Sequence, residues 1–582
     1  MYSMYTILDI KKQLTTELKK TLQSINFPDT IRLETPSFPE FGDIAFPCFS
    51  LCKISKKSPE DTAKQIANNL LLPKGIKKYE IHSGYLNFWF DEKKILSESL
   101  SNILSAKEKY GKLEKKQKKV IVEHTSANPN GPLHVGRARN PIIGDTIARL
   151  MKAAGYIVET QFYLDDLGKQ VAILTWAIHH LKEKELSEKT RDKPDHHAVR
   201  FYQKAHDLMK KDEQIKQEID TLVHQSELGD EKVISLGKKA YEPVLAGIKE
   251  SLNEINITID NFIPESKFVK DGSVNKVIEK LKETPYCENE KGALYLDVSS
   301  FGVKGRTTKF FLTRSNGTTL YATRDIAYHQ WKSKHANLLI NILGEDHKLE
   351  SRQVEIALEL LQVENRPSPV FYAFVSLPGG KMSTRRGRVV YLDDLIVEIK
   401  ERALKEVKKR RGKELSEEKM RLIAEVVGIG ALRYNIIKVQ PEKDIEFKWE
   451  EALNFDGNTA PFIQYAIARC ASIQRKGKID NEQFSSQINA SILTHESEIQ
   501  LGKQLAQFPM VIDDAAHSYK PHLITQFLFE TASLFNQFYR DCPVLTAENT
   551  PLKKSRLGLV LSTKIVLKNG LHLLGIDALE EM

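Results

Sequence analysis

The segment from residue 120 to 137, VIVEHTSANPNGPLHVGR, constrains the fold of this chain more than any other stretch. Residues 120–122 are a short β-branched run typical of a buried parallel strand, and a turn-rich loop with two prolines and a glycine follows. Apolar residues then recur at helical spacing from Ile142 to Met151, and Gly155 stands where a helix is expected to end. The pattern predicts a strand, a loop and a helix, which together are the start of a doubly wound α/β sheet.

The four residues His134-Val135-Gly136-Arg137 fall at the junction between that loop and the helix. In an open α/β sheet such a junction lies at the carboxyl edge of the strands, where helix N–H groups and the helix dipole favour bound phosphate. Gly136 has no Cβ, so a flat adenine or ribose can approach its backbone closely. A lone histidine at this position could equally just cap the helix, so the motif alone leaves both interpretations open.

The longer string around this junction resembles the signature of a known enzyme family. Pro-Leu-His-Val-Gly-Arg is similar to the HIGH signature of class I aminoacyl-tRNA synthetases, and Glu-x-x-Ser-x-Asn before it is similar to arginyl-tRNA synthetases in particular. Arg137 stands where the family usually has a second histidine. The resemblance implies nucleotide-binding and catalytic roles for His134, Gly136 and Arg137, and arginine binding by Glu123, Ser126, Asn128 and His134.

A second signature, LPGGKMSTRRGR at residues 377–388, lies about 250 residues downstream. Its Lys-Met-Ser-Thr-Arg run is similar to the KMSKS loop of class I synthetases, with Thr384 in place of the second lysine. Dense positive charge on a loop suits transfer to phosphorus, because charge must be neutralised at the transferring group and at the leaving pyrophosphate. Taken alone, a Gly-Gly-Lys loop is a surface turn at least as often. The resemblance implies catalytic roles for Lys381, Met382, Ser383 and Arg385, with Lys381 also binding ATP.

Residues 320–328, LYATRDIAY, carry the features expected of an arginine receptor. On a helix Tyr321 and Asp325 share one face, and a guanidinium needs a carboxylate in bidentate reach and tolerates an aromatic face beside it. Considered alone, Asp325 could instead pair with Arg324 or another surface cation. Leu-Tyr-x-Thr-Arg-Asp resembles the arginyl enzymes, which implies arginine binding by Tyr321 and Asp325, and the family's substrate-binding glutamine is matched by Gln353.

Further strands are predicted from apolar and alternating runs. Residues 156–163 are expected to be the second strand, and 292–298 with 310–312 the start of the second half of the sheet. An apolar strand at 338–343 ends in the turn Gly344-Glu345-Asp346-His347. Because the carboxyl ends of parallel strands share an edge, Gly344, Glu345, Asp346 and His347 are expected beside the first signature as part of the ATP site.

Residues from about 171 to 260 are polar, helical in pattern and without visible chemistry, and they are predicted to be an insertion. The pairs His179-His180 and His196-His197 fall inside it. Adjacent residues on a helix point about 100° apart, so these histidines are expected to be solvated and not to bind a metal ion.

The two ends of the chain have different patterns. Residues 1–113 predict an α+β unit with helices near 7–24 and 59–71 and a strand at 79–90. The Gly-Tyr-Leu-Asn-Phe run in that strand resembles the N-terminal domain of arginyl-tRNA synthetases, which implies that Tyr85 and Asn87 contact a splayed tRNA base. The aromatic residues could equally be core. Residues from about 451 predict amphipathic helices of a bundle that resembles the anticodon-binding domain.

Length and composition are those of a protein with several globular domains. A chain of 582 residues with 41% apolar and 28% charged residues is expected to form three or four domains. The predicted fold is an α/β catalytic core with a doubly wound, Rossmann-like parallel sheet of the class I synthetase type, an α+β N-terminal domain and an all-α C-terminal helical bundle. The predicted divisions are 1–113, 114–400, a helical connector at 401–450, and 451–582.

The expected cell compartment follows from what the sequence contains. No apolar run approaches the roughly 20 residues that span a bilayer, and the N-terminus lacks a signal-peptide core. Five mostly scattered cysteines fit reduced thiols, so a cytoplasmic protein without a membrane partner is expected. The formal charge of +9 permits a polyanionic partner without requiring one.

The resemblance implies ATP-dependent ligation of L-arginine to the 3′ end of its tRNA through an arginyl-adenylate, with release of AMP and pyrophosphate. ATP with Mg²⁺ is expected as a substrate, without a tightly bound cofactor or a metal site, and tRNA(Arg), L-arginine and ATP are the expected partners of a monomer. The residues alone support only a nucleotide-binding α/β enzyme with a helical appendage. A different class I synthetase or nucleotidyltransferase remains an alternative, and so does a non-catalytic tRNA-binding paralogue, because Thr384 replaces a lysine.

Overall fold

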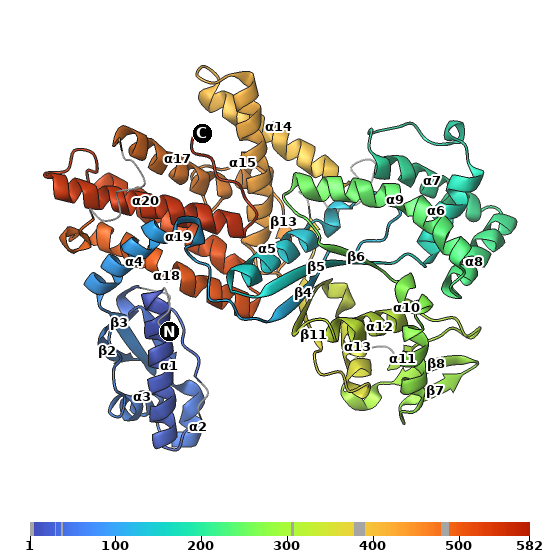
Figure 1. Cartoon of the computed structure of the whole chain (residues 1–582), viewed down its shortest axis with the longest axis horizontal. Helices are drawn as coiled ribbons and strands as arrows, with labels where there is room; N and C mark the ends of the chain where they lie inside the picture. Colours follow the sequence, from blue (N-terminus) through green and yellow to red (C-terminus); the bar gives the residue numbers. More distant parts are fainter. Residues whose placement is uncertain (1–4, 29–30, 37–38, 304–307, 377–389, 479–487) are drawn as a thin grey trace.

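The computed structural model describes residues 5–28, 31–36, 39–303, 308–376, 390–478 and 488–582. At its centre lies a five-stranded parallel sheet in the order β11-β10-β4-β5-β6 (Figure 1). The strands are β4 (Lys119–Glu123), β5 (Ile157–Leu164), β6 (Asn261–Pro264), β10 (Leu338–Gly344) and β11 (Pro367–Tyr372). The chain runs from β4 outward to β6 on one side and returns to β10 on the other. Strands β4 and β10 therefore flank the topological switch point, where open α/β sheets bind ligands.

Helix α5 (Arg139–Ala153) connects β4 to β5. It ends as predicted: Gly155 has φ +89°, and the N–H of Tyr156 donates to the carbonyl of Met151 at 3.1 Å. A Cβ at residue 155 would lie 1.9 Å from the carbonyl oxygen of Glu114, so no other residue fits there without a backbone shift.

The strands predicted at 292–298 and 310–312 do not join the central sheet. Strands β7 (Cys287–Glu290), β8 (Ala293–Asp297) and β9 (Lys309–Phe311) form a separate antiparallel sheet. The placement in the second half of the parallel sheet was therefore wrong. Parallel neighbours need a crossover helix between them, and the stretch from β8 to β9 is too short for one.

Helices surround and extend this core. The predicted insertion contains α6 (Lys169–His180), α7 (Pro194–Met209), α8 (Glu213–Glu227) and α9 (Glu231–Glu254). Between β6 and β11 lie α10 (Ser266–Lys270), α11 (Ser273–Lys282), α12 (Tyr321–Ser333) and α13 (Lys348–Leu360). His196 of α7 is only 5% exposed and contacts Asp393, so the prediction that the insertion histidines are solvated is wrong for this residue.

The N-terminal unit contains a three-stranded antiparallel sheet in the order β1-β3-β2. Its elements are α1 (Thr6–Ser24), β1 (Ile44–Pro47), α2 (Cys52–Ser55), α3 (Pro59–Ala67), β2 (Ile76–His82), β3 (Tyr85–Phe90) and α4 (Glu92–Ala106). The single strand predicted at 79–90 is a hairpin, because Ser83 (φ +48°) and Gly84 (φ +81°) form a two-residue turn of the type that needs two positive φ values. Such a turn barely interrupts an alternating pattern.

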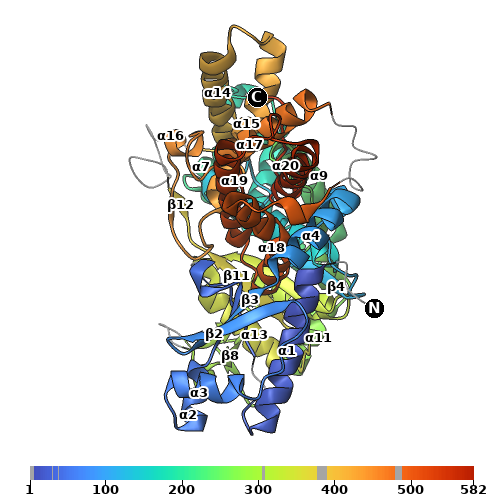
Figure 2. The ribbon, with the colours of Figure 1, turned by 90° about the vertical axis from the view of Figure 1, so that its left-hand side faces the viewer.

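The C-terminal part is an all-α bundle, as predicted. The short parallel strands β12 (Val375–Ser376) and β13 (Ile445–Glu446) pair with each other, and helices α14 (Leu392–Arg411) and α15 (Glu417–Ile437) lie between them in the chain. After β13 come α16 (Trp449–Ala452), α17 (Ala460–Lys476), α18 (Glu496–Ser518), α19 (His522–Asp541) and α20 (Thr550–Leu573). Figures 1 and 2 place the N-terminal unit below this bundle, where α1 and α4 pack on α18. No helix in the described ranges is both long and apolar enough to cross a membrane.

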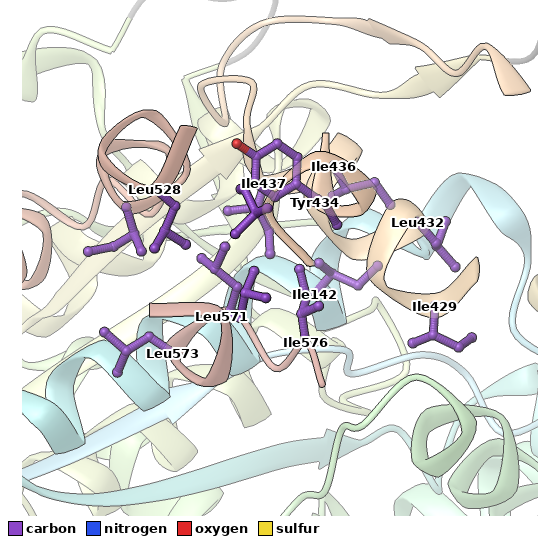
Figure 3. Packing of buried hydrophobic residues seen from close by; sticks show 14 of the residues in the cluster. Ile142, Ile429, Leu432, Tyr434, Ile436, Ile437, Leu528, Leu571, Leu573 and Ile576 are labelled. Carbon is purple, nitrogen blue, oxygen red and sulfur yellow. The ribbon is translucent and has the colours of Figure 1, made fainter. Parts of the chain in front are cut away.

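One hydrophobic core joins the central sheet to the bundle. Ile142 of α5 packs among apolar residues of α15, α19 and α20 (Figure 3). At the edge of this core the buried Arg433 of α15 donates to Asp145 of α5 at 2.5 Å and to the carbonyl of Leu574 at 2.7 Å. The fold therefore fixes the bundle to the helix that follows the first signature.

Candidate active site

His134 caps the short turn that leads from the β4 loop into α5. Its Nδ1 accepts a hydrogen bond from the backbone N–H of Gly136 at 3.1 Å. Burial, together with the positive charge of Arg137, lowers the pKa of His134. A neutral imidazole whose Nδ1 accepts carries its proton on Nε2, so the ring offers one N–H donor to a ligand oxygen. The sequence left two roles open for His134, capping the helix and binding phosphate. The structure allows both, because Nδ1 forms the cap while Nε2–H remains to donate.

The backbone around His134 pairs with the chain that enters α14. The N–H of Val135 donates to the carbonyl of Val390 at 3.0 Å. The N–H of Leu392 donates to the carbonyl of Leu133 at 2.8 Å. Strand β12, which precedes the second signature, contacts the turn after His134. The predicted catalytic residues Lys381, Met382, Ser383 and Arg385 lie outside the described residues.

A continuous chain of hydrogen bonds connects two of the carboxylates predicted to bind arginine. Asp325 Oδ1 lies 3.0 Å from His329 Nδ1, and His329 Nε2 lies 2.5 Å from the amide nitrogen of Asn341. The amide oxygen of Asn341 accepts from Lys332 at 3.0 Å. Lys332 also donates to Glu123 Oε2 at 2.6 Å. Because Asn341 of β10 lies opposite Glu123 of β4 in the sheet, the chain spans the switch point.

Asp325 is the exposed end of this chain, which we call the Asp325–Glu123 chain. Its side chain is 24% exposed, whereas that of Lys332 is fully buried. Burial acts to raise the pKa of Asp325, but His329, Lys332 and His347 outweigh it, so the pKa is lowered. The carboxylate therefore stays ionised, is oriented from one side and is open on the other, as a guanidinium receptor requires.

The alternative that Asp325 pairs with Arg324 does not hold. Arg324 donates from Nε to Glu265, and its Nη1 lies 3.8 Å from Glu227. Both of those glutamates are buried. In the part of the chain that the structure describes, the ion-pair partner of Asp325 is His329.

Glu350 of α13 links Tyr321 to the turn Glu345–His347. Its carboxylate lies 3.1 Å from His347 Nδ1 and shares a hydrogen bond with the side chain of Tyr321. Burial and this bond raise the pKa of Tyr321, and the bond from Glu350 raises the pKa of His347. The Glu345, Asp346 and His347 side chains are 39%, 59% and 48% exposed. The aromatic end of the predicted arginine site is thus tied to the predicted ATP turn.

The loop after β4 has a strained backbone. Thr125 (φ +72°) and Ser126 (φ +36°) are in the left-handed region, which costs energy for residues other than glycine. Asn140 stabilises the turn because its side-chain oxygen accepts from the N–H of Thr125 at 2.6 Å and its nitrogen donates to Ile342 of β10 at 2.9 Å. Ser126 Oγ accepts from the N–H of Tyr163 at 3.1 Å. Strain held by surrounding bonds in this way is typical of a binding site.

Sequence comparison with known proteins assigns nearly the whole chain to known domain families. Residues 9–90, 99–449 and 463–582 match the families described as arginyl tRNA synthetase N terminal domain, tRNA synthetases class I (R) catalytic domain, and DALR anticodon binding domain. The arginine–tRNA ligase of Methanocella arvoryzae is 48% identical over 534 residues, which cover 92% of each chain. That of Methanosarcina barkeri is 42% identical and covers 99% of this chain and 100% of the relative. This chain belongs to the arginyl-tRNA synthetase family.

Solved structures agree with that assignment. Thermus thermophilus arginyl-tRNA synthetase superposes with a TM-score of 0.84 at 28% identity, over 98% of this chain and 100% of that one. Arginyl-tRNA synthetase from Plasmodium falciparum, with a TM-score of 0.79 and 21% identity, shares the fold. The predicted family and the predicted class I fold are therefore confirmed.

Within this arginyl-tRNA synthetase fold, the structure connects only some of the predicted site residues. Ser126 donates to Glu123 Oε1 at 3.3 Å. Gln353 is 7% exposed on α13 and Asn128 is half-buried in the loop before His134. Neither of these two side chains bonds to the described residues, so their assignment to arginine stays a prediction.

The two residues predicted to contact tRNA lie far from this site, on the N-terminal sheet. Asn87 and Tyr85 are on the face of β3 opposite the core residues Leu86 and Phe88. Asn87 is 3% exposed, and the ring of Tyr85 packs edge-on against Phe49 at 5.0 Å. At 3% exposure, Asn87 can contact a base only if its neighbours move.

Sequence reasoning missed the residues that hold the arginine site together. His329 and Lys332 follow Asp325 at i+4 and i+7, so all three share a helical face, and this spacing was the available signal. Asn140 and Asn341 gave no such signal, because their partners come from other strands and loops.

Proposed function

We propose that this protein ligates L-arginine to the 3′ end of tRNA(Arg) in an ATP-dependent reaction that proceeds through an arginyl-adenylate. The observation that carries the proposal is the partly exposed, ionised Asp325 at the end of a buried chain that begins at Glu123, the last residue of the strand leading to His134. Asp325 suits a guanidinium and the His134 Nε2–H suits a phosphate oxygen. Their arrangement at one sheet edge supports a site where arginine and ATP meet.

The first step is adenylate formation. An oxygen of the arginine carboxylate attacks the α-phosphorus of ATP, a new P–O bond forms, and the bond to pyrophosphate breaks. His134 donates to a phosphate oxygen, and Lys381 with Arg385 neutralises charge on the leaving pyrophosphate. Asp325 and Tyr321 hold the guanidinium end, so that the carboxylate is positioned for in-line attack.

The second step transfers the amino acid. A ribose hydroxyl of the 3′-terminal adenosine attacks the carbonyl carbon of the adenylate, and the bond from that carbon to the phosphate oxygen breaks. The products are arginyl-tRNA and AMP, and the hydroxyl proton leaves with the AMP phosphate or with water. ATP enters with Mg²⁺, and Glu345 and Asp346 offer exposed carboxylate oxygens of the kind that Mg²⁺ prefers.

Two surfaces support tRNA binding. On the N-terminal sheet, Tyr85 and Asn87 are proposed to contact an unpaired base. In the bundle, Arg469 of α17 lies over the exposed rings of Tyr465 and Tyr539, at 4.9 and 5.3 Å. Exposed aromatic rings beside a guanidinium are the groups on which unpaired bases stack. We further propose that the protein acts as a cytoplasmic monomer with the four-part division predicted from its sequence.

The decisive experiment is pyrophosphate exchange with each of the twenty amino acids, with and without tRNA. Exchange that depends on arginine, followed by transfer to tRNA(Arg), is expected. Exchange with another amino acid would favour a different class I synthetase, and tRNA binding without exchange would favour a non-catalytic paralogue.

The role of the second signature is tested by Lys381→Ala, because Lys381 is the only lysine within residues 381–388. The activation rate should fall by about 10²-fold, with tRNA affinity nearly intact. Lys409→Ala, in the basic end of α14, is the matched control. Equal rates in Lys381→Ala and parent would remove Lys381 from the mechanism.

A further inference from the structure

A second buried polar cluster lies between the insertion and the start of α14. Lys193 Nζ lies 2.9 Å from Asp393 Oδ1 and 3.5 Å from Asp195 Oδ2. His196 Nε2 lies 2.7 Å from Asp393 Oδ2. Ser251 of α9 donates to Asp393 Oδ1 at 2.8 Å. We call these five residues the Asp393 cluster; its charged side chains are between 0% and 7% exposed.

A metal ion is not needed to explain this cluster. Asp195, His196 and Asp393 do place possible ligand atoms within 4.8 Å of one another. The ammonium of Lys193, however, is within 3.5 Å of both carboxylates, so it supplies the positive charge itself and would repel a second cation. The cluster is a set of ion pairs that joins two parts of the chain.

The cluster holds the first turn of α14, which directly follows the segment that pairs with the backbone around His134. Asp393 directly follows Leu392, whose N–H donates to the carbonyl of Leu133. His134 and Tyr391 form the antiparallel bridge between the two segments. The ring of Tyr391 also packs edge-on against His196, with centroids 5.1 Å apart. The insertion therefore contacts Tyr391, the backbone partner of His134.

We propose that Asp393 is a positioning residue for the nucleotide site. Through Lys193 and His196, the insertion holds residues 390–393 against residues 133–135 and so fixes the imidazole of His134. This inference rests on the proposed role of His134 in binding ATP. It gives a function to the insertion, in which the sequence shows no chemistry of its own.

The physical reason is that buried ion pairs fix geometry strictly. When Asp393 is replaced by an uncharged residue, the ammonium of Lys193 is left poorly paired in a buried site. The surrounding helices must then shift or admit water. A shift of residues 390–393 passes to His134 through two backbone hydrogen bonds. Displacement of a ligand-binding group by about 1 Å can lower a rate by about 10²-fold, so smaller shifts should still be measurable.

The test is Asp393→Asn, which keeps the shape of the side chain, compared with Glu398→Gln, which removes an exposed carboxylate from the next turn of α14. In pyrophosphate exchange below the melting temperature of each variant, Asp393→Asn should raise the KM for ATP by about tenfold. The KM for arginine and for tRNA should change by less than about twofold. Glu398→Gln should match the parent.

The coupling between partners gives a second readout. If Lys193 acts through Asp393, the double variant Lys193→Met/Asp393→Asn should have no higher KM for ATP than the worse single variant. Additive effects would mean that the two residues act separately and would overturn the proposal. A lowered melting temperature with the parental KM for ATP would also overturn it, because the cluster would then be structural only.

Two further variants keep the test decisive. If Asp393→Asn does not fold, Ser251→Ala is used instead. It removes the hydrogen bond that Ser251 donates to Asp393 and the one that it accepts from Lys193, and it leaves the Lys193–Asp393 ion pair in place. A KM for ATP about threefold above the parent is expected, and a parental value refutes the inference. His134→Ala is the reference. If it too keeps the parental KM for ATP, the proposed function of His134 has failed, and the proposal fails with it for that distinguishable reason.

Discussion

The Asp325–Glu123 chain and the Asp393 cluster contain the same kinds of group but differ at their ends. Each combines a buried lysine, a histidine and two carboxylates. The first chain reaches a carboxylate that is 24% exposed, whereas every charged side chain of the second is at most 7% exposed. Ions that are buried and paired on all sides can only hold structure, while an oriented and open carboxylate can also bind a ligand. The exposed carboxylate at one end therefore distinguishes the Asp325–Glu123 chain, a binding site, from the Asp393 cluster, which only holds two segments together.

The largest effect is expected at the open end. Asp325→Asn should lower kcat/KM for arginine by about 10²–10³-fold, because an amide cannot neutralise the guanidinium or accept two parallel hydrogen bonds from it. The melting temperature should change little, since the side chain is partly exposed. Exchange kinetics at varied arginine and saturating ATP measure this, with Glu355→Gln on α13 as control. If Asp325→Asn keeps the parental kinetics, the arginine receptor lies elsewhere, and exposure of the carboxylate does not mark a binding site.

The buried middle of the Asp325–Glu123 chain should stabilise the fold, as the Asp393 cluster does. Lys332→Met leaves the buried carboxylate of Glu123 unpaired, which should lower the free energy of unfolding by about 3–5 kcal/mol. Thermal unfolding compares it with Lys334→Met, whose exposed side chain lies at the C-cap that follows the same helix. Adding Glu123→Gln should restore part of the lost stability, because the unpaired charge is then removed. Parental stability in Lys332→Met would mean that the chain holds no structure.

Sequence patterns predicted the local parts of this site well. Residues 120–155 were readable because a β-branched run, turn residues, a helical period and a C-terminal glycine all act within a few residues of one another. The strands at 293–311 were placed in the wrong sheet, because alternation reports one buried face and not which sheet a strand joins.

Local sequence patterns could not predict the buried clusters of charged residues. His196 was predicted to be solvated because its neighbours in sequence are polar, but its partner Asp393 is 197 residues away. The arginine site was partly readable, since Asp325, His329 and Lys332 share one helical face. That Lys332 is buried depends on Glu123, which is 209 residues away, and no local pattern records such a pair.

A third buried imidazole, that of His124, extends the comparison because it forms no ion pair with a carboxylate among the described residues; its Nδ1 shares a hydrogen bond with Thr125 Oγ1 at 2.9 Å. His124 Nε2 has no hydrogen-bond partner among the described residues, and burial lowers the pKa of His124 from 6.5 to about 4. The unfolded chain therefore binds more protons than the folded one between pH 6.5 and 4, so stability falls as pH falls through that window, by about 3 kcal/mol in total. Thermal unfolding of His124→Gln should show a shallower decline with pH than the parent.

The control for that pH series is His335→Gln, since His335 is exposed on the surface. It should follow the parental curve. If His124→Gln also follows the parental curve, the proton uptake belongs to other groups, and burial without a carboxylate partner does not distinguish His124 from His196 and His329.

The smallest effect is expected at the far end of the Asp325–Glu123 chain. Ser126 Oγ donates to Glu123 Oε1 at 3.3 Å and accepts from the N–H of Tyr163 at 3.1 Å, so Ser126→Ala loses two ordinary hydrogen bonds. The net contribution of one such bond is about 0.5–1.5 kcal/mol, and the loss of that amount from arginine binding corresponds to a KM for arginine about 2–13-fold above the parent. Ser333→Ala, which removes a long 3.4 Å bond on α12, is the control.

This last variant also tests whether the chain acts as one unit. If bonds along it orient Asp325 together, Ser126→Ala should add little once Asp325→Asn has already removed the guanidinium contact, because coupled sites are not additive. Exchange kinetics of both single variants and the double variant give the coupling. Full additivity would mean that Ser126 and Asp325 act on arginine independently, and the open end would then owe its orientation to His329 alone.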